Sequence, residues 1–208
     1  DAGADPNLAN IDGLAPLYAT INMRFAPVSW APNPPTAQEE VNAVELLEAL
    51  LDAGADPNAR IARGLWFSPT SHNRLWIDPA GATPFWRAAQ ASDVESMRPL
   101  LAAGADPDLS TFDGTTPLMV AAGIGWRGNF SQNAPDSWMK AVHFLAEIGA
   151  DVNAVDDSGY TAMHGAAALG NKEMVEFLLA RGAKVDAINK AGNSPADMAF
   201  GPSRFFIP

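Results

Sequence analysis

Cysteine is absent from this chain of 208 residues. No disulfide framework and no thiolate metal site can therefore form, and the cysteine content does not indicate whether the protein occupies an oxidising or a reducing compartment. No run of apolar residues is long enough to span a membrane. Basic residues are scarce, with 13 Lys and Arg against 24 Asp and Glu, so the formal net charge is −11. Because a nucleic-acid-binding surface needs a basic stripe, this balance argues against a nucleic-acid partner.

A short pattern recurs along the chain: Gly-Ala, then Asp or Lys, then any residue, then Asn or Asp. Its copies begin at Gly3, Gly54, Gly104, Gly149 and Gly182. A second pattern, similar to Thr-Pro-Leu, follows most of these glycines after a similar interval. Its copies begin at Ala15, Thr116, Thr161 and Ser194, and one more, at Thr83, is delayed by inserted residues. A fixed period of this kind indicates a repeat architecture.

Residues 154–186 form the most regular unit, and its elements can be predicted from local chemistry. Thr161 is a suitable N-cap for a first, alanine-rich helix. Gly170 and Asn171 interrupt that helix, and a second is expected over residues 172–181, ended by Gly182 in the left-handed conformation. Helical spacing predicts that the second helix turns four side chains toward the core: Met174, Val175, Leu178 and Leu179.

These two patterns and their period of about 33 residues resemble the ankyrin repeat, a β-turn followed by two helices. The resemblance covers nearly the whole chain and implies an all-α solenoid of helix-turn-helix repeats joined by hairpin fingers. The expected organisation is a single domain over residues 1–208. It begins with the tail of a repeat (1–7), continues through four repeats (8–58, 59–108, 109–153 and 154–186) and ends with a partial repeat (187–208). By the same resemblance, His164 is expected to hydrogen-bond the backbone near a repeat junction.

Three of the units are longer than the repeat and therefore contain insertions. In the first, a proline-rich stretch follows the helix expected over 16–24, and a capping box at Thr36 and Glu39 predicts that the outer helix starts there, with Val41, Val44, Leu47 and Leu51 buried. The second insertion enlarges the finger over residues 60–79, before helices at about 84–91 and 93–102. The third covers roughly 126–137, between the helices, and Gly125 aligns with Gly170.

Aromatic residues gather in these insertions and supply the candidate partner-binding site. Four of the six tryptophans lie there, and protein interfaces are enriched in Trp, Tyr and Arg. The finger reverses the charge of the chain, with three arginines against Asp78. An equally good interpretation is that each insertion folds back on its own Trp. The candidate residues are Arg60, Arg63, Trp66, Phe67, His72, Arg74 and Trp76 in the finger, with Trp30 and Trp126 in the other insertions.

Patterns typical of catalysis or cofactor binding have structural explanations in this sequence. Residues 123–128 match G-x-G-x-x-G by letter, but the dinucleotide site needs a strand before the motif, and a helix is expected there. The three histidines do not pair at metal-ligand spacing. We therefore expect no catalytic, cofactor or metal residues, and no enzyme activity. The acids of residues 156–157 suit a turn.

The resemblance implies a non-catalytic module or assembly subunit that binds a protein partner through its fingers, its concave face and the aromatic insertions. Two alternatives stay open: a ligand-binding or enzymatic site roofed by the insertions, and an architectural spacer in a larger chain. Long insertions resemble those of some bacterial ankyrin proteins, several of which are exported, so a periplasmic or secreted location is open beside a cytoplasmic one. Since the chain opens inside a repeat, we expect further repeats or a partner to cover Leu17, Ile21, Leu46 and Leu50.

Overall fold

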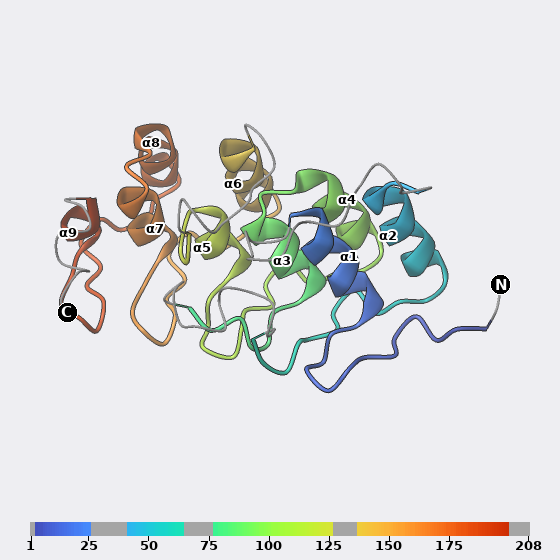
Figure 1. Cartoon of the computed structure of the whole chain (residues 1–208). Coiled ribbons are helices and arrows are strands. Elements are labelled where there is room, and N and C mark those ends of the chain that lie inside the picture. The colour runs from blue at the N-terminus through green and yellow to red at the C-terminus, as the bar shows by residue number, and fades with distance from the viewer. Residues whose placement is uncertain (1–2, 26–40, 65–76, 127–136, 200–208) are drawn as a thin grey trace.

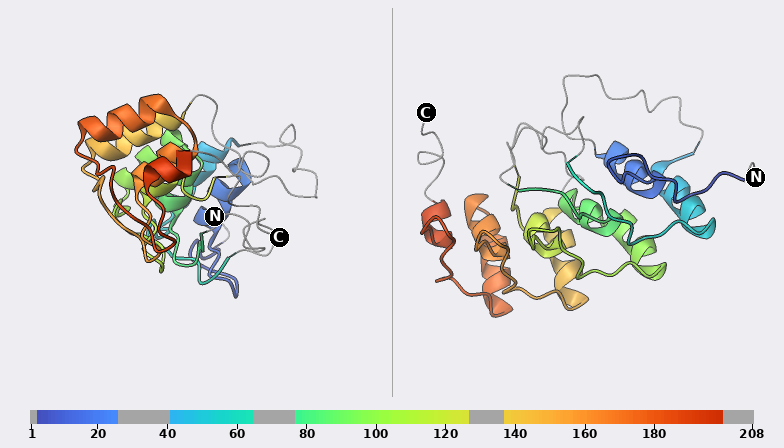
Figure 2. Two further views of the ribbon diagram at one scale, coloured as in Figure 1. Left: turned by 90° about the vertical axis from the view of Figure 1, so that its left-hand side faces the viewer. Right: turned by 90° about the horizontal axis from the view of Figure 1, so that it is seen from below.

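A computed structural model describes residues 3–25, 41–64, 77–126 and 137–199, and within these ranges the chain forms helices and connecting loops but no strand. Inner and outer helices alternate along the chain and build two layers, with the connecting fingers projecting on one side (Figures 1 and 2). The inner helices are α1 (Pro16–Arg24), α3 (Pro84–Gln90), α5 (Pro117–Ala121), α7 (Ala162–Ala168) and α9 (Pro195–Ala199). The outer helices are α2 (Ala43–Asp52), α4 (Val94–Ala102), α6 (Trp138–Glu147) and α8 (Lys172–Ala180). The all-α solenoid is confirmed.

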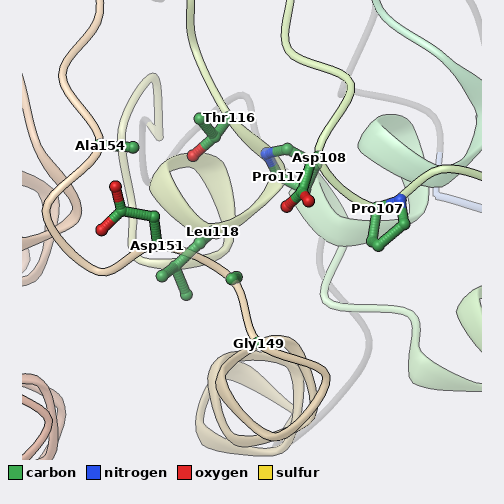
Figure 3. Close-up of a pocket in the computed structure, with 9 residues that line it drawn as sticks. Pro107, Asp108, Thr116, Pro117, Leu118, Gly149, Asp151 and Ala154 are labelled. Atoms are coloured by element: carbon green, nitrogen blue, oxygen red, sulfur yellow. The ribbon is translucent and has the colours of Figure 1, made fainter.

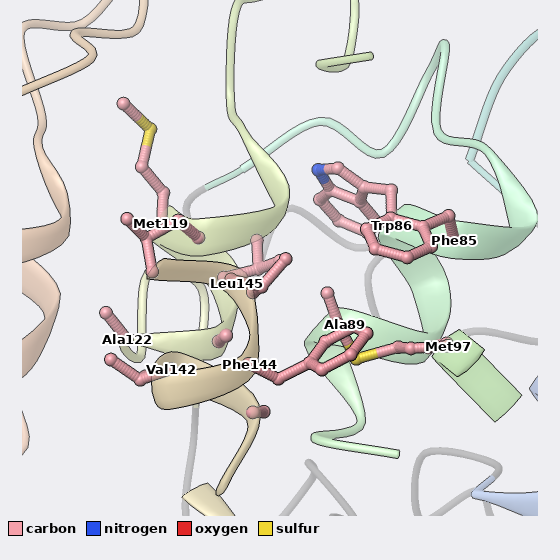
Figure 4. Packing of buried hydrophobic residues seen from close by; sticks show 14 of the residues in the cluster. Phe85, Trp86, Ala89, Met97, Met119, Ala122, Val142, Phe144 and Leu145 are labelled. Carbon is pink, nitrogen blue, oxygen red and sulfur yellow. The ribbon is translucent and has the colours of Figure 1, made fainter. Parts of the chain in front are cut away.

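The inner helices α1, α3, α5 and α7 each pack on their own outer helix and on the next inner helix, so the core is a strip that runs the length of the stack. Small residues make the close approach possible. A Cβ atom at Gly165 of α7 would lie 2.7 Å from the carbonyl oxygen of Ala122 and 2.8 Å from the nitrogen of Ile124. Figure 4 shows the centre of the strip, where large side chains of α3 and α6 fill the space between the layers.

Local signals place most helix ends where the sequence predicts them. Proline occupies the first turn of α1, α3 and α5. Thr83 and Thr116 accept hydrogen bonds from the nitrogens of Trp86 (3.1 Å) and Met119 (3.3 Å). Four glycines follow outer helices with φ between +84° and +99°, as expected: Gly54, Gly104, Gly149 and Gly182.

Replacing Gly182 by valine should lower the free energy of unfolding by more than about 1 kcal/mol, because a residue with a branched Cβ resists its φ of +84°. Nothing lies within 4 Å of the site where the Cβ would stand, so the cost is conformational and not steric. Thermal unfolding of Gly182→Val and Gly182→Asn measures it. Asparagine tolerates the left-handed region, so its variant should be less affected. An unchanged midpoint for valine would contradict the assignment of Gly182 as the end of α8.

Several detailed expectations are wrong. The helix α2 begins at Ala43, behind a capping box made by Asn42 and Glu45, so it is not lengthened, and Val41 is exposed. The predicted box at Thr36 and Glu39 lies outside the described residues. Leu179 is also exposed, because only Met174 and Leu178 of α8 are fully enclosed by α7.

The helix α5 ends two residues earlier than the alignment of Gly125 with Gly170 predicts. Gly123 takes the left-handed position, and Ile124 then donates to the carbonyl of Met119 (3.0 Å), as Asn171 donates to Ala166 (3.2 Å). Ending the helix here buries Ile124 almost completely. The gain from burying an isoleucine, about 1.5–3 kcal/mol, explains why the earlier glycine ends the helix.

The first repeat is better covered than expected. Leu17 and Ile21 are both 1% exposed, because α1 lies against α2 and α3. Leu46 is exposed and Leu50 is half-buried, as predicted. The expectation that Leu17 and Ile21 need an upstream neighbour or a partner to cover them is therefore wrong, and of the four residues only Leu46 is exposed.

Candidate partner-binding surface

The fingers between successive repeats are joined by backbone hydrogen bonds into one continuous edge. One amide of each finger donates to a carbonyl of the finger before it. The four bonds are Ala62 to Asp12 (2.7 Å), Phe112 to Ala80, Asp157 to Asp113 and Lys190 to Ser158 (each 2.8 Å). This linkage holds the fingers at fixed positions, so side chains from different repeats form one surface.

Large apolar side chains stand exposed along this finger edge, which we define by its exposed apolar residues: Leu8, Ile11, Phe112, Val155 and Ile188. The exposed fractions include 86% for Ile11, 65% for Phe112 and 59% for Ile188. Their neighbours in the turns, such as Asp12 and Asp156, are buried and polar. The turn thus hides its polar residue and presents an apolar one to solvent.

Sequence reasoning did not select these residues. The sequence does contain a signal that could have identified them, because an apolar residue recurs beside the turn of most fingers. A lone exposed apolar residue needs no explanation, so only the structure, which sets several of them on one edge, gives the pattern meaning.

Of the candidates in the second finger, Arg60 is half-buried and is held by backbone carbonyls. Its Nη1 donates to the carbonyl oxygens of Gly81 (3.1 Å) and Ser110 (2.9 Å), and its guanidinium lies 5.6 Å from the centre of the Phe112 ring. The side chain therefore joins the base of the insertion to the next finger. It also supports one face of Phe112, a residue of the finger edge.

Arg63 forms an ion pair with Asp12 of the preceding finger, while its own side chain stays 62% exposed. The buried Ile61 and Ile77 anchor the two ends of the insertion in the stack. The remaining candidates lie outside the described residues: Trp30, Trp66, Phe67, His72, Arg74 and Trp76.

Trp126 packs on Trp138 at the start of α6, with ring centroids 5.4 Å apart in an edge-to-face arrangement. Both rings are half-buried. Trp126 is the first residue of the third insertion and Trp138 follows its last, so the pair closes the base of the insertion. This contact supplies Trp126 with an internal packing partner.

A buried polar network links the first two full repeats near the end of α1. Arg87 of α3 donates to the amide oxygen of Asn22 (2.9 Å) and to the carbonyl of Phe25 (2.6 Å). Burial lowers the pKa of Arg87, and burial raises the pKa of the adjacent Tyr18 to about 12, against the opposing charge of Arg87. The negative charge of Asp93 opposes this lowering of the Arg87 pKa. The network is structural, because its members are turned inward.

The histidines that the structure describes have packing partners. His164 accepts from the Thr161 nitrogen at Nδ1 (3.1 Å), and its Nε2 lies 3.2 Å from the Asn193 carbonyl across the junction, as the resemblance implies. Burial lowers its pKa. His143 is exposed and stacks on Phe177, with centroids 4.1 Å apart. Within the described ranges no group of three or more His, Cys, Asp or Glu could hold a metal ion.

No helix in the described part of the chain is both long and apolar enough to cross a membrane. The segment before the G-x-G-x-x-G letters is α5, not a strand. That motif therefore lacks the strand-to-helix turn on which a dinucleotide site depends.

The two layers of paired helices, with fingers linked in a row, define a helical-repeat solenoid of the kind that binds along an extended surface. A family model for ankyrin repeats, in three copies, matches residues 85–189, and the chain belongs to the ankyrin-repeat family. Ankyrin repeats are in general modules of protein–protein interaction and not enzymes.

The chain is also similar to parts of several neurogenic locus notch homolog proteins. It is 36% identical over 139 residues to "Neurogenic locus notch homolog protein 2" of Homo sapiens, a match that covers 66% of this chain and 4% of the relative. It is 32% identical over 152 residues to "Neurogenic locus notch homolog protein 1" of Homo sapiens, covering 72% of this chain and 5% of the relative. The chain thus spans about one twentieth of the length of these relatives.

Proposed function

We propose that this chain is a non-catalytic module that binds a protein partner along the finger edge. The observation that carries the proposal is the row of exposed apolar side chains on fingers fixed by backbone hydrogen bonds. Exposed apolar groups that gather on one surface mark interaction sites, because leaving them in water is costly. The aromatic insertion of the second finger extends the same role, since residues 65–76 fall between the two described ends of that finger in the sequence.

The net charge of the chain indicates which kind of partner would fit this surface. The finger edge lies in a strongly acidic chain, so a partner with basic groups around an apolar centre fits it best. Phe112 is the natural anchor, since aromatic residues dominate the energetics of interfaces. The guanidinium of Arg60 lies over the Phe112 ring and restricts the motion of that ring before the partner binds.

The replacement Phe112→Ala should weaken binding to the partner by a factor of about 10 or more, the loss expected of an interface anchor. The partner is first identified by co-purification from the native source with mass spectrometry. Binding of the pure proteins is then measured by calorimetry, and the melting temperature is measured alongside. Because Phe112 is 65% exposed, the folded state should keep its stability.

Leu179→Ala serves as the matched control, since Leu179 is an exposed apolar residue on the outer helix α8, away from the fingers. It should bind as the unmodified chain does. Trp66→Ala and Trp76→Ala test the insertion in the same assay. If Phe112→Ala binds as well as the control, the finger edge is not the interface.

A further inference from the structure

Asparagine side chains bridge three of the repeat junctions in the same way. Asn7 donates from Nδ2 to the Gly54 carbonyl (2.9 Å), and its Oδ1 accepts from the Asp56 nitrogen (2.7 Å). Asn58 bridges Gly104 and Asp106 (3.0 and 2.8 Å), and Asn153 bridges Gly182 and Lys184 (3.0 and 2.9 Å). Each carboxamide thus satisfies one backbone acceptor and one backbone donor at the end of the next outer helix.

At the one remaining junction, which lies between those of Asn58 and Asn153, the bridging position holds Asp108. A carboxylate has no hydrogen-bond donor, so it cannot satisfy the carbonyl of Gly149, the equivalent of the glycines above. Among the described residues, neither the Gly149 carbonyl nor the Asp151 nitrogen has a side-chain partner at this junction. The change from amide to acid removes the donor for the Gly149 carbonyl, and the Asp151 nitrogen also has no side-chain acceptor among the described residues.

A pocket of about 250 Å³ lies at this junction. Pro107 and Asp108 form one side and Gly149 and Asp151 the other, with the start of α5 between them (Figure 3). Leu118 and Pro117 contribute apolar surface. The volume is below the range of about 300–1,000 Å³ that is usual for drug-sized ligands, so the pocket suits a single side chain.

We infer that this pocket takes the carboxamide of an asparagine or glutamine side chain from the protein partner. The inference rests on the proposed function and names the chemistry of one contact. The carbonyl of the carboxamide would accept from the Asp151 nitrogen, and its NH₂ group would donate to the Gly149 carbonyl and to Asp108. The three asparagine bridges of this chain show that the equivalent backbone pair binds a carboxamide at 2.7–3.0 Å.

Other side chains match the pocket less well. A partner carboxylate would meet the like charge of Asp108 and could not donate to Gly149. A guanidinium or ammonium group would suit Asp108 but has no acceptor for the Asp151 nitrogen. A cationic side chain would therefore leave the Asp151 nitrogen without a hydrogen bond, which is costly for a donor taken out of water. The pair of one backbone donor and one backbone acceptor is what distinguishes this pocket from an ordinary acidic surface.

The test uses acetamide as the probe and the Asp151 amide resonance of the full ¹⁵N-labelled chain as the readout. Acetamide should shift this resonance in a saturable way, whereas acetate and methylguanidinium should shift it less. In Asp108→Asn the chain's own carboxamide fills the position. The Asp151 response should then disappear, and the unfolding midpoint should rise by about 2–4 °C.

Asn153→Asp is the matched control, because it creates the same gap at the next bridge and should make the Lys184 amide responsive. An Asp151 resonance that ignores acetamide, follows acetate or methylguanidinium more strongly, or responds equally in Asp108→Asn would overturn the inference. The titration needs no protein partner. A negative titration therefore contradicts only the carboxamide pocket and not the finger edge as the interface. A Phe112→Ala variant that binds normally contradicts only the finger edge and not the binding of a carboxamide in the pocket.

Discussion

Replacing Trp86 by alanine should lower the free energy of unfolding by about 3–5 kcal/mol, the range seen when a buried tryptophan or phenylalanine is truncated. Trp86 lies in α3, is 0% exposed, and is among the largest of the fully buried side chains. Its indole Nε1 donates to the Thr115 carbonyl of the following finger (2.9 Å), so one residue both fills the core and joins two repeats. Chemical denaturation followed by circular dichroism measures the loss.

Two further variants separate the effects at this position. Trp86→Phe keeps most of the apolar volume but removes the donor to Thr115, so it should cost less than alanine. Leu46→Ala removes an exposed side chain of α2 and should change stability little, within about 0.5 kcal/mol. A cost below about 1 kcal/mol for Trp86→Ala would contradict a filled core at the centre of the stack.

Replacing Asp93 by alanine should cost about 3–5 kcal/mol, as the removal of one partner from a buried ion pair does. Asp93 is 1% exposed and caps α4 by accepting from the Ser96 nitrogen (3.3 Å). Both of its carboxylate oxygens lie 3.1 Å from Nη1 of Arg24. Without it, the buried guanidinium of Arg87 loses the favourable charge of a nearby carboxylate.

Asp93→Asn distinguishes the charge from the cap. Its amide oxygen can still accept from the first turn of α4, because asparagine is a good N-cap residue. It cannot balance Arg24 and Arg87. The asparagine variant should therefore fall between the native chain and Asp93→Ala in a urea titration. Equal losses for the two variants would assign the whole effect to the charge, and a native-like Asp93→Ala would show that the network adds no stability.

The sequence alone determined the features that depend on residues close together in the chain. Proline and threonine at helix starts and glycine at helix ends act within one turn, so the boundaries of α1, α3, α4 and α8 were predicted within a residue or two. The repeat period then identified the solenoid, because one unit cannot bury its apolar face without neighbours. Where two local signals competed, as at Gly123 and Gly125, the burial of Ile124 decided.

Only the tertiary structure decided the features that join residues about 30 to 70 positions apart. Asp108 looks like a conservative variant of asparagine in the repeat pattern, yet the lack of a donor becomes important only when Gly149 and Asp151 lie opposite it. Arg87 resembles a surface charge until α1 and α4 enclose it. Side-chain hydrogen bonds across a junction depend on how the repeats stack, and the stacking is fixed by packing along the whole core and not by any single unit.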